Sequence, residues 1–439
     1  MKNIHIYLIL ISLCTSFSCA QSENPPFIEL GDESKIYLEK VVDGIDIPWG
    51  ISFINENEIL VTDKKGILYH VKDNIKTPVK GIPKVVENRQ GGLLDIEVDK
   101  DFENNRRIFL TTSNSSSNSK ESNTALYSAD YNDFKISNLK LLYKATPDSD
   151  QYRHYGGKIL LDDKYVYFTV GDRAGRDIYP QDLTKDGGKL YRLYLDGSIP
   201  KDNPFYNMKN AKKAIWSYGH RNPQGIIFGN EPGDIIVHEH GPRGGDEINI
   251  IRERDSIREE PLLTRNYGWP IVSNGINYNG TSFTDLTSLE GTETPAYFWT
   301  PSIAPSGMTM LTSDIYDEWE GNLFIGSLRF RYLERMELIG NYVYKREKLL
   351  DRVGRVREVV QGPDGFLYVG IEKKGIFKII PSKVNLIEYN SIGDESFKSA
   401  SQNMINLYKD LLEKNKITVT VRRSRGKDID AACGQLANK

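Results

Sequence analysis

The sequence predicts an all-β fold, a six-bladed β-propeller with a short α/β appendage at the C-terminal end. Three observations support this prediction. Short β-rich runs recur after turn residues, the first and last of these units resemble each other, and the chain changes character after Pro381 and Ser382. Repetition of one turn-bounded strand unit is typical of propellers and other repeat folds.

The repeated unit is a run of β-branched, aromatic and aliphatic residues that favours a strand. Several units continue into a second strand beyond a glycine turn, most clearly at 64–69, 188–193 and 373–378. The likeness of the units at 64–69 and 373–378 predicts circular closure, with the strand near 36–38 completing the last blade. A β-sandwich followed by a second domain is the alternative, because turn-bounded strands alone fit both folds. The six runs are 59–62, 108–111, 166–170, 235–237, 323–326 and 367–370.

Composition limits the class of protein. The chain has 439 residues, of which 39% are hydrophobic and 27% charged, which is ordinary for globular domains. The formal net charge is -3, and no basic stripe of the kind that nucleic-acid binding needs is present. The three cysteines are Cys14, Cys19 and Cys433. Between residues 21 and 382 the chain has no cysteine. This excludes internal disulfides, Fe–S clusters and covalently attached c-type haem from that part of the chain.

Residues 1–20 read as an export signal. Lys2 precedes an apolar stretch over 4–13, and a run of mostly small residues follows at 16–21. The apolar stretch is too short to span a bilayer as a mature helix. Cleavage after Ala20 would release a periplasmic protein, whereas cleavage before Cys19 would leave a lipid-anchored protein at the cell envelope. Both outcomes are open at this point.

The segment after Ser382 forms a separate region, residues 383–439. It is expected to hold a helix over about 394–413 between two strand-like runs. Apolar residues recur there at the spacing of one helical face, which predicts a buried face. These residues are Met404, Leu407, Leu411 and Leu412.

Three short motifs combine reactive side chains with Gly or Pro, which allow tight backbone turns and close approach of a ligand. His154 precedes Gly156 and Gly157, and a histidine is the usual general base near neutral pH. Arg221 and Asn222 stand in a Gly-His-Arg-Asn-Pro-Gln-Gly turn that suits an oxygen-rich ligand. The third motif, at 240–247, offers oxygen ligands to a hard cation such as calcium. Each motif alone also fits a structural turn.

Four arginines come late in the chain, and two of them alternate on an expected strand. Arg355 and Arg357 would therefore point to one face, where two cations favour carboxylates or phosphates. Arg329 and Arg331 precede them. An exposed strand is the alternative interpretation.

From about residue 35 to 382 the chain resembles the soluble PQQ-dependent sugar dehydrogenases, in particular the aldose sugar dehydrogenases. That family's fold is a six-bladed propeller. Arg153 stands where the glucose dehydrogenases have an acid. The matching stretches, in order, are Ile47–Gly50, Gln90–Leu94, His154–Gly157, Leu195–Pro200, Arg221–Asn222, Gly241–Asn249, Asn266–Pro270, Ile303–Gly307 and Arg355–Arg357.

The resemblance implies oxidation of an aldose at C1 to a lactone, with PQQ and calcium as cofactors and a quinone or cytochrome as electron acceptor. His154 would take the sugar hydroxyl proton as hydride leaves for the quinone, and Arg221 would stabilise the developing charge. Calcium would be bound by Gly241, Pro242, Glu247 and Tyr267. The chain would act as a monomer or dimer. PQQ would be held by Gln90, Arg221, Asn222, Tyr278, Arg329, Arg331, Arg355 and Arg357. The rival interpretation is a catalytically silent extracellular propeller that binds sugars or proteins.

Residues 383–439 resemble the C-terminal end of radical-SAM adenine methyltransferases that modify ribosomal and transfer RNA. The runs 384–390 and 422–436 carry the likeness, and Cys433 stands where that family has its methyl-carrying cysteine. The family's three-cysteine cluster motif is absent from the sequence. We therefore expect a fused remnant without methyltransferase activity.

Overall fold

The computed structural model describes residues 29–30, 36–117, 120–252, 265–316, 319–340, 342–381, 383–387, 400–414 and 418–422. The predicted signal segment 1–20, residues 253–264 and Cys433 lie outside these residues. No helix in the described part of the chain is long and apolar enough to cross a membrane.

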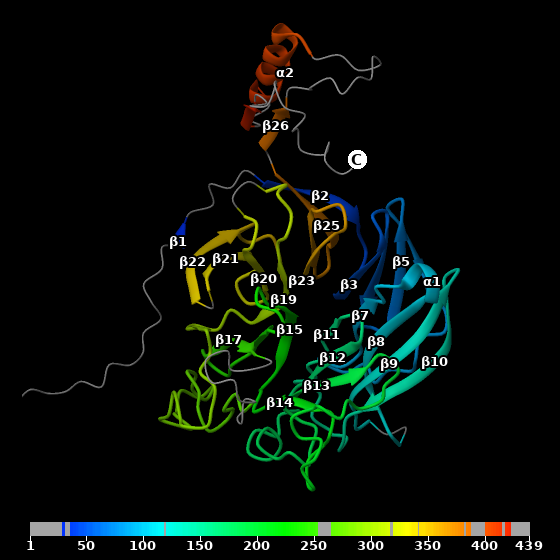
Figure 1. The fold of residues 1–439 in the computed structure, drawn as a ribbon, viewed down its shortest axis with the longest axis vertical. Helices are drawn as coiled ribbons and strands as arrows, with labels where there is room; N and C mark the ends of the chain where they lie inside the picture. The colour runs from blue at the N-terminus through cyan, green and yellow to red at the C-terminus, as the bar shows by residue number, and fades with distance from the viewer. Residues whose placement is uncertain are drawn as a thin grey trace, which may run out of the picture.

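Six antiparallel blades of four strands each follow one another around a ring, which confirms the predicted propeller (Figure 1), and the sheet of the fifth blade has one additional, parallel strand at its edge. Each predicted run forms the second strand of its blade. Antiparallel strands that are joined by short turns pair with their neighbours in sequence. The first three blades are β3 (Pro48–Asn55), β4 (Glu58–Asp63), β5 (Ile67–Lys72) and β6 (Ile75–Pro78); β7 (Leu93–Val98), β8 (Arg107–Asn114), β9 (Asn123–Asn132) and β10 (Lys135–Lys144); and β11 (Ile159–Leu161), β12 (Tyr165–Val170), β13 (Lys189–Tyr194) and β14 (Ile215–Tyr218).

The other three blades include the one that closes the ring. In the last blade β2 pairs with β25, with Ile36 opposite Pro381, so the predicted closure by the strand near residue 36 is confirmed. β1 (Glu29–Leu30) pairs with β22, and α1 (Phe102–Asn105) connects β7 to β8. These blades are β15 (Pro223–Phe228), β16 (Ile235–Glu239), β17 (Asp246–Ile251) and β18 (Tyr297–Trp299); β19 (Pro305–Met310), β20 (Leu323–Ser327), β21 (Leu333–Ile339) and β22 (Tyr342–Leu349); and β23 (Val356–Gln361), β24 (Leu367–Ile371), β25 (Gly375–Pro381) and β2 (Ile36–Val42).

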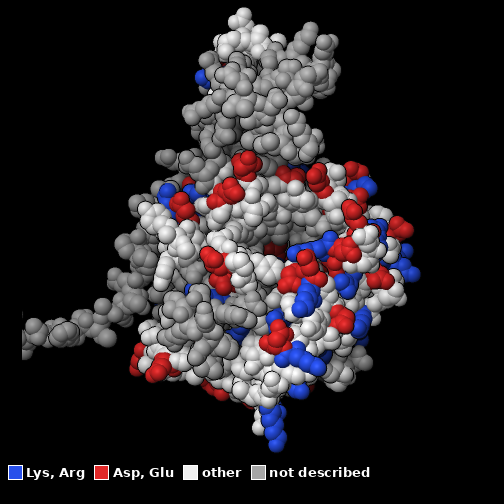
Figure 2. Space-filling model, in the orientation of Figure 1, with Lys and Arg blue, Asp and Glu red and all other residues white. Residues whose placement is uncertain are grey.

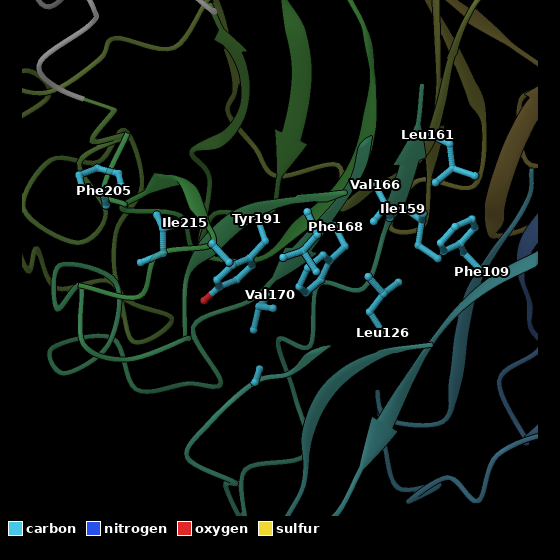
Figure 3. Close-up of a cluster of buried hydrophobic side chains, with 13 residues drawn as sticks. Phe109, Leu126, Ile159, Leu161, Val166, Phe168, Val170, Tyr191, Phe205 and Ile215 are labelled. Carbon is cyan, nitrogen blue, oxygen red and sulfur yellow. The ribbon is translucent and has the colours of Figure 1, made fainter. Parts of the chain in front are cut away.

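Apolar side chains from neighbouring blades form the core. In one cluster Phe109 and Leu126 of the second blade pack with Ile159, Phe168 and Tyr191 of the third (Figure 3). The Phe168 and Tyr191 rings stack with centroids 4.9 Å apart. Burial of such faces between successive sheets holds the ring together, so each blade depends on its neighbours.

Glycine is required at the turns of the two similar units. Gly66 lies between β4 and β5 with φ +91°, and Gly375 begins β25 with φ +111°. A Cβ on Gly375 would lie 2.0 Å from the Val42 carbonyl oxygen of the closing strand. The glycine thus allows β25 to lie close to β2 in the last blade.

A buried ionic cluster joins three blades near the ring's centre. The Lys158 ammonium lies 3.1 Å from Asp95 of β7 and contacts the Glu358 carboxylate of β23. Burial alone would lower the pKa of Lys158, but Asp95 and Glu358 raise it, so the lysine stays charged. The view in Figure 2 shows the ring hollowed at its middle, with acidic and basic residues interspersed around the hollow.

The C-terminal region forms an α/β unit outside the ring, as predicted (Figure 1). β26 (Lys383–Ile387) pairs in parallel with β27 (Thr418–Arg422), and α2 (Gln402–Lys414) lies between them in sequence. The predicted buried face of this helix is wrong: Met404, Leu407 and Leu411 are exposed, and Leu412 is only partly buried. Two short strands are too narrow a sheet to cover the apolar stripe.

Candidate active site

His154 is held by an acidic side chain and by an unusual backbone conformation. It lies in the segment between β10 and β11 with φ +55°, and its amide donates to the Gln90 side-chain oxygen at 2.6 Å. Its Nδ1 lies 2.7 Å from Asp172 Oδ1. A carboxylate can only accept here, so the proton sits on Nδ1 and the Nε2 lone pair is free to take a proton.

The electrostatics keep this imidazole neutral. Burial lowers the pKa of His154 most, Arg221 lowers it further, and Asp172 opposes both. Burial alone would raise the pKa of Asp172, but His154 and Arg221 bring it below the ordinary value. Trp269 Nε1 donates to Asp172 Oδ2 at 2.9 Å. The arrangement is a neutral base held by an ionised, fully hydrogen-bonded acid.

Arg221 is fixed in the turn that leads into β15. Its Nη1 donates to the His240 carbonyl at 2.9 Å, its Nη2 lies 3.5 Å from the Tyr278 hydroxyl, and its guanidinium lies over the Trp269 ring. Its backbone amide donates to the buried Glu239 carboxylate. These contacts hold a permanent cation close to the base, where it can stabilise negative charge on a ligand.

Two cavities lie beside His154 and Arg221. The first, which we call the His154 cavity, has a volume of about 380 Å³ and is lined by His154, Asp172, Arg221, Trp269 and Tyr278, among others. The second, the Arg357 cavity, also has a volume of about 380 Å³. Its lining includes Trp49, Lys64, Arg89, Gln90, Asn222, Gln224, Arg355, Arg357 and Glu372.

The two cavities have no lining residue in common, but adjacent residues of the same segments line them. His154 lines the His154 cavity, and Gly156 lines the Arg357 cavity. In the same way, Arg221 lines the first cavity and its neighbour Asn222 lines the second. The Asn222 side-chain oxygen accepts from the Gly156 amide at 3.2 Å, which ties the two segments together. The predicted motifs therefore form one composite site with a proton acceptor on one side and cations on the other.

The two late arginines converge on one acid, as the alternating pattern predicts. Glu372 accepts from Arg355 Nε at 2.6 Å and from Arg357 Nε at 2.9 Å. Burial alone would raise the pKa of Glu372, but the two guanidiniums lower it. Both guanidiniums are thereby held in place, with donors left for another anion.

Three other predicted cofactor residues do not line the Arg357 cavity. Arg329 and Arg331 are exposed, and the lining of the Arg357 cavity does not include them. Tyr278 lines the His154 cavity and is 71% exposed. Their role in holding a cofactor stays a prediction.

The predicted metal ligands stand around β17. Asp246 accepts from the Gly241 amide at 2.8 Å and so fixes the Gly241–Pro242 turn, and Pro242 lines the His154 cavity. Burial and then Glu239 raise the pKa of Glu247 to about 8. Tyr267 donates its hydroxyl to the Ile250 carbonyl at 3.0 Å. Within the described ranges no three His, Cys, Asp or Glu side chains group as a metal site, so a cation here would depend on carbonyl oxygens as well as carboxylates.

Sequence reasoning missed Asp172, Trp269, Glu239 and Glu372. Asp172 had a signal, because it lies two residues after the strand 166–170, where polar side chains often enter a site. Glu239 ends β16 and bonds His220 at 2.9 Å and the Arg221 amide. No local pattern marks Glu372, whose partners are 15 and 17 residues away.

Comparison with known proteins assigns the chain to a family. The model of the glucose/sorbosone dehydrogenase family matches residues 45–378, three quarters of the chain. The chain belongs to the glucose/sorbosone dehydrogenase family. It is 37% identical over 342 residues to the aldose sugar dehydrogenase YliI of Escherichia coli, covering 76% of this chain and 89% of that protein.

Solved structures of family members have the same fold. The soluble aldose sugar dehydrogenase of E. coli in its apo form superposes with a TM-score of 0.72 and 34% identity, over 79% of this chain and 99% of that one. The PQQ-bound aldose sugar dehydrogenase of Streptomyces coelicolor has a TM-score of 0.63 at 22% identity, over 79% and 98%, which shows the fold alone.

The tail has a different relative. Over 62 residues it is 69% identical to a probable dual-specificity RNA methyltransferase, RlmN, of Christiangramia forsetii. The match covers 14% of this chain and 18% of the methyltransferase. The likeness is thus limited to a short piece of that protein.

Proposed function

We propose that this member of the glucose/sorbosone dehydrogenase family oxidises aldose sugars at C1 to lactones, with PQQ and calcium as cofactors. The observation that carries the proposal is the His154–Asp172 pair beside a cationic cavity. The names of relatives support it: one is an aldose sugar dehydrogenase, and one is the quinoprotein glucose dehydrogenase B of Acinetobacter calcoaceticus, 27% identical over 350 residues, 72% of this chain and 67% of that protein.

The lining of the Arg357 cavity fits PQQ, a planar tricarboxylate. Lys64, Arg89, Arg355 and Arg357 line it with one acid, Glu372, so positive charge is in excess. Guanidinium and ammonium groups bind carboxylates by charge-assisted hydrogen bonds. Gln90, Asn222 and Gln224 add amide donors, and the Trp49 indole offers a flat apolar surface. These residues would hold the cofactor next to the base.

The chain's own residues would supply acid–base chemistry and orientation. PQQ, when bound, supplies an electrophilic quinone that accepts the hydride from C1. His154 Nε2 takes the C1 hydroxyl proton, while Asp172 holds Nδ1 and stabilises the imidazolium that forms. Arg221 stabilises negative charge that develops on the reacting oxygens. Trp269 donates to Asp172 and packs against Arg221, so it holds both side chains in position.

Gly241 and Pro242 would offer carbonyl oxygens to calcium, and Glu247 would offer a carboxylate. Carboxylate and carbonyl oxygens are calcium's usual ligands. A half-buried Glu247 opposite Glu239 is also electrostatically costly, as its raised pKa indicates, and a cation would offset that cost. Tyr267 donates its hydroxyl proton to the Ile250 carbonyl, and its oxygen would keep lone pairs for the cation.

The remaining expectations concern location and partners. Export by the signal segment 1–20 would place the protein in the periplasm or, through Cys19, at the cell envelope by a lipid anchor. There a quinone or cytochrome would accept the electrons, with no nucleic-acid partner and with the chain as monomer or dimer. The methyltransferase-like tail would be inactive, because it matches only 18% of that relative and carries one cysteine.

Reconstitution of the full chain with PQQ and calcium tests the proposed function. We expect dye-linked oxidation of aldoses that is lost on chelation of calcium and restored when calcium is added. The released product should be the lactone. A folded, PQQ-loaded protein that oxidises no aldose would refute the proposal and favour a silent binding propeller.

A further inference from the structure

A larger cavity lies between the fourth and fifth blades, outside the two cavities of the active site. Its volume is about 1060 Å³. We call it the Phe330 cavity. Its walls come from the segments 273–276 and 282–287, from β18 and the residues after it, from Phe330 and Tyr332 before β21, and from β22 and the residues after it.

One short segment separates this cavity from the base. Ser273, Asn274, Gly275 and Ile276 line the Phe330 cavity, whereas the next residues, Asn277 and Tyr278, line the His154 cavity. Backbone pairing of Ile276 with Arg243 holds the segment in place. A molecule bound in the larger cavity would therefore lie close to the reacting centre without entering it.

The lining combines aromatic rings with hydroxyl and amide groups. Phe330 is 41% exposed, and its ring lies nearly parallel to that of Tyr332, with centroids 6.4 Å apart. Phe298 adds a third ring. Hydroxyl and amide groups come from Ser273, Asn274, Ser282, Thr284, Thr287 and Thr300. Apolar rings with scattered donors and acceptors suit a ligand that has both apolar faces and many hydroxyls.

The charges of the lining nearly cancel. Arg346 donates to Glu334 at 2.6 Å, and Arg352 Nε lies 3.7 Å from Asp351. Lys348 and Asp285 add one charge of each sign. A phosphate or polycarboxylate ligand would need an excess of cations, as the Arg357 cavity has. The balance therefore favours an uncharged ligand.

We propose that the Phe330 cavity binds a neutral oligosaccharide chain, with a sugar ring stacked on Phe330. The apolar C–H face of a pyranose packs on an aromatic ring, and its hydroxyls bond to serine, threonine and asparagine side chains. The cavity would anchor a carbohydrate close to the active site. This binding is independent of the proposed oxidation, since no cofactor contributes to it.

Calorimetric titration of the full chain, with no PQQ added, tests this proposal. Maltotetraose and cellotetraose are the probes, and tetragalacturonate is the charged comparison. We expect at least one neutral tetrasaccharide to bind, more tightly than tetragalacturonate. Phe330→Ala should weaken that binding roughly tenfold or more, through loss of stacking and buried area. Thr287→Trp, which narrows the cavity and leaves Phe330 in place, should weaken it as well.

Two control variants locate the site. Phe134→Ala removes a phenylalanine of matched exposure, 40%, on the second blade and should not change the affinity. His154→Asn should not change it either. The proposal is overturned if neither neutral tetrasaccharide binds, if tetragalacturonate binds as tightly, or if both cavity variants bind like the wild type. Circular dichroism of each variant confirms that it is folded.

Discussion

Replacing His154 by Asn is expected to lower kcat for aldose oxidation by a factor of about 10² to 10⁴, the range that general-base catalysis contributes. Asn cannot take a proton at neutral pH, but it has a similar polar outline and can still hydrogen-bond to Asp172. PQQ binding should change little, because the cations of the Arg357 cavity are untouched. Steady-state kinetics per mole of bound PQQ measures the effect.

A matched substitution separates chemistry from folding. His70→Asn alters a buried histidine on β5 that contacts Tyr131 and Glu58, outside both site cavities. Folded His70→Asn protein should keep the wild-type kcat. If His154→Asn also keeps it with PQQ bound, another group is the base and the mechanism fails.

Replacing Lys158 by Met is expected to cause a large loss of stability, about 3 to 5 kcal/mol in the free energy of unfolding. Lys158 is buried, and its removal leaves Asp95 and Glu358 as uncompensated buried carboxyls from two different blades. The pKa of Glu358 is already raised to about 7 by burial, with Lys158 opposing. Urea denaturation of both proteins measures the difference.

The pH dependence of this loss follows from the carboxyls. Their raised pKa values mean that ionisation costs stability, and loss of Lys158, which lowers the pKa of Glu358, increases that cost, so protonation relieves the variant as the pH falls. The loss should therefore be smaller at pH 5 than at pH 8. Lys164→Met, which changes an exposed lysine of the third blade, should alter stability by no more than about 0.5 kcal/mol. A Lys158→Met loss equal to that of Lys164→Met would show that the cluster does not join the blades.

The fold could be predicted because each blade is local. Strands such as β4 and β5 pair across a short turn, so a turn-bounded strand and the glycine after it mark a whole blade. Closure of the ring could also be predicted, because the first and last repeat units resemble each other. The run at 36–38 does pair with β25. The buried face predicted for α2 failed because a helical pattern shows which residues could be buried and not whether anything covers them.

The site was predictable only in part, for a related reason. His154, Arg221 and Arg357 stand in glycine-rich or alternating patterns that a reader of the sequence can find. The residues that hold them come from distant segments: Asp172 is 18 residues from His154, and Trp269 is 97 residues from Asp172. Such partners are set by the arrangement of blades, which a local pattern does not contain.

Titration of the calcium-loaded full chain with PQQ tests the central claim, that the Arg357 cavity is a cofactor site, most directly. We expect saturation at one equivalent. The double variant Arg355→Gln/Arg357→Gln should bind about 10² to 10⁴ times more weakly, because two charge-assisted contacts are lost. Arg352→Gln, a surface substitution, should bind like the wild type. Absence of stoichiometric binding, or equal affinity in the double variant, would contradict the account.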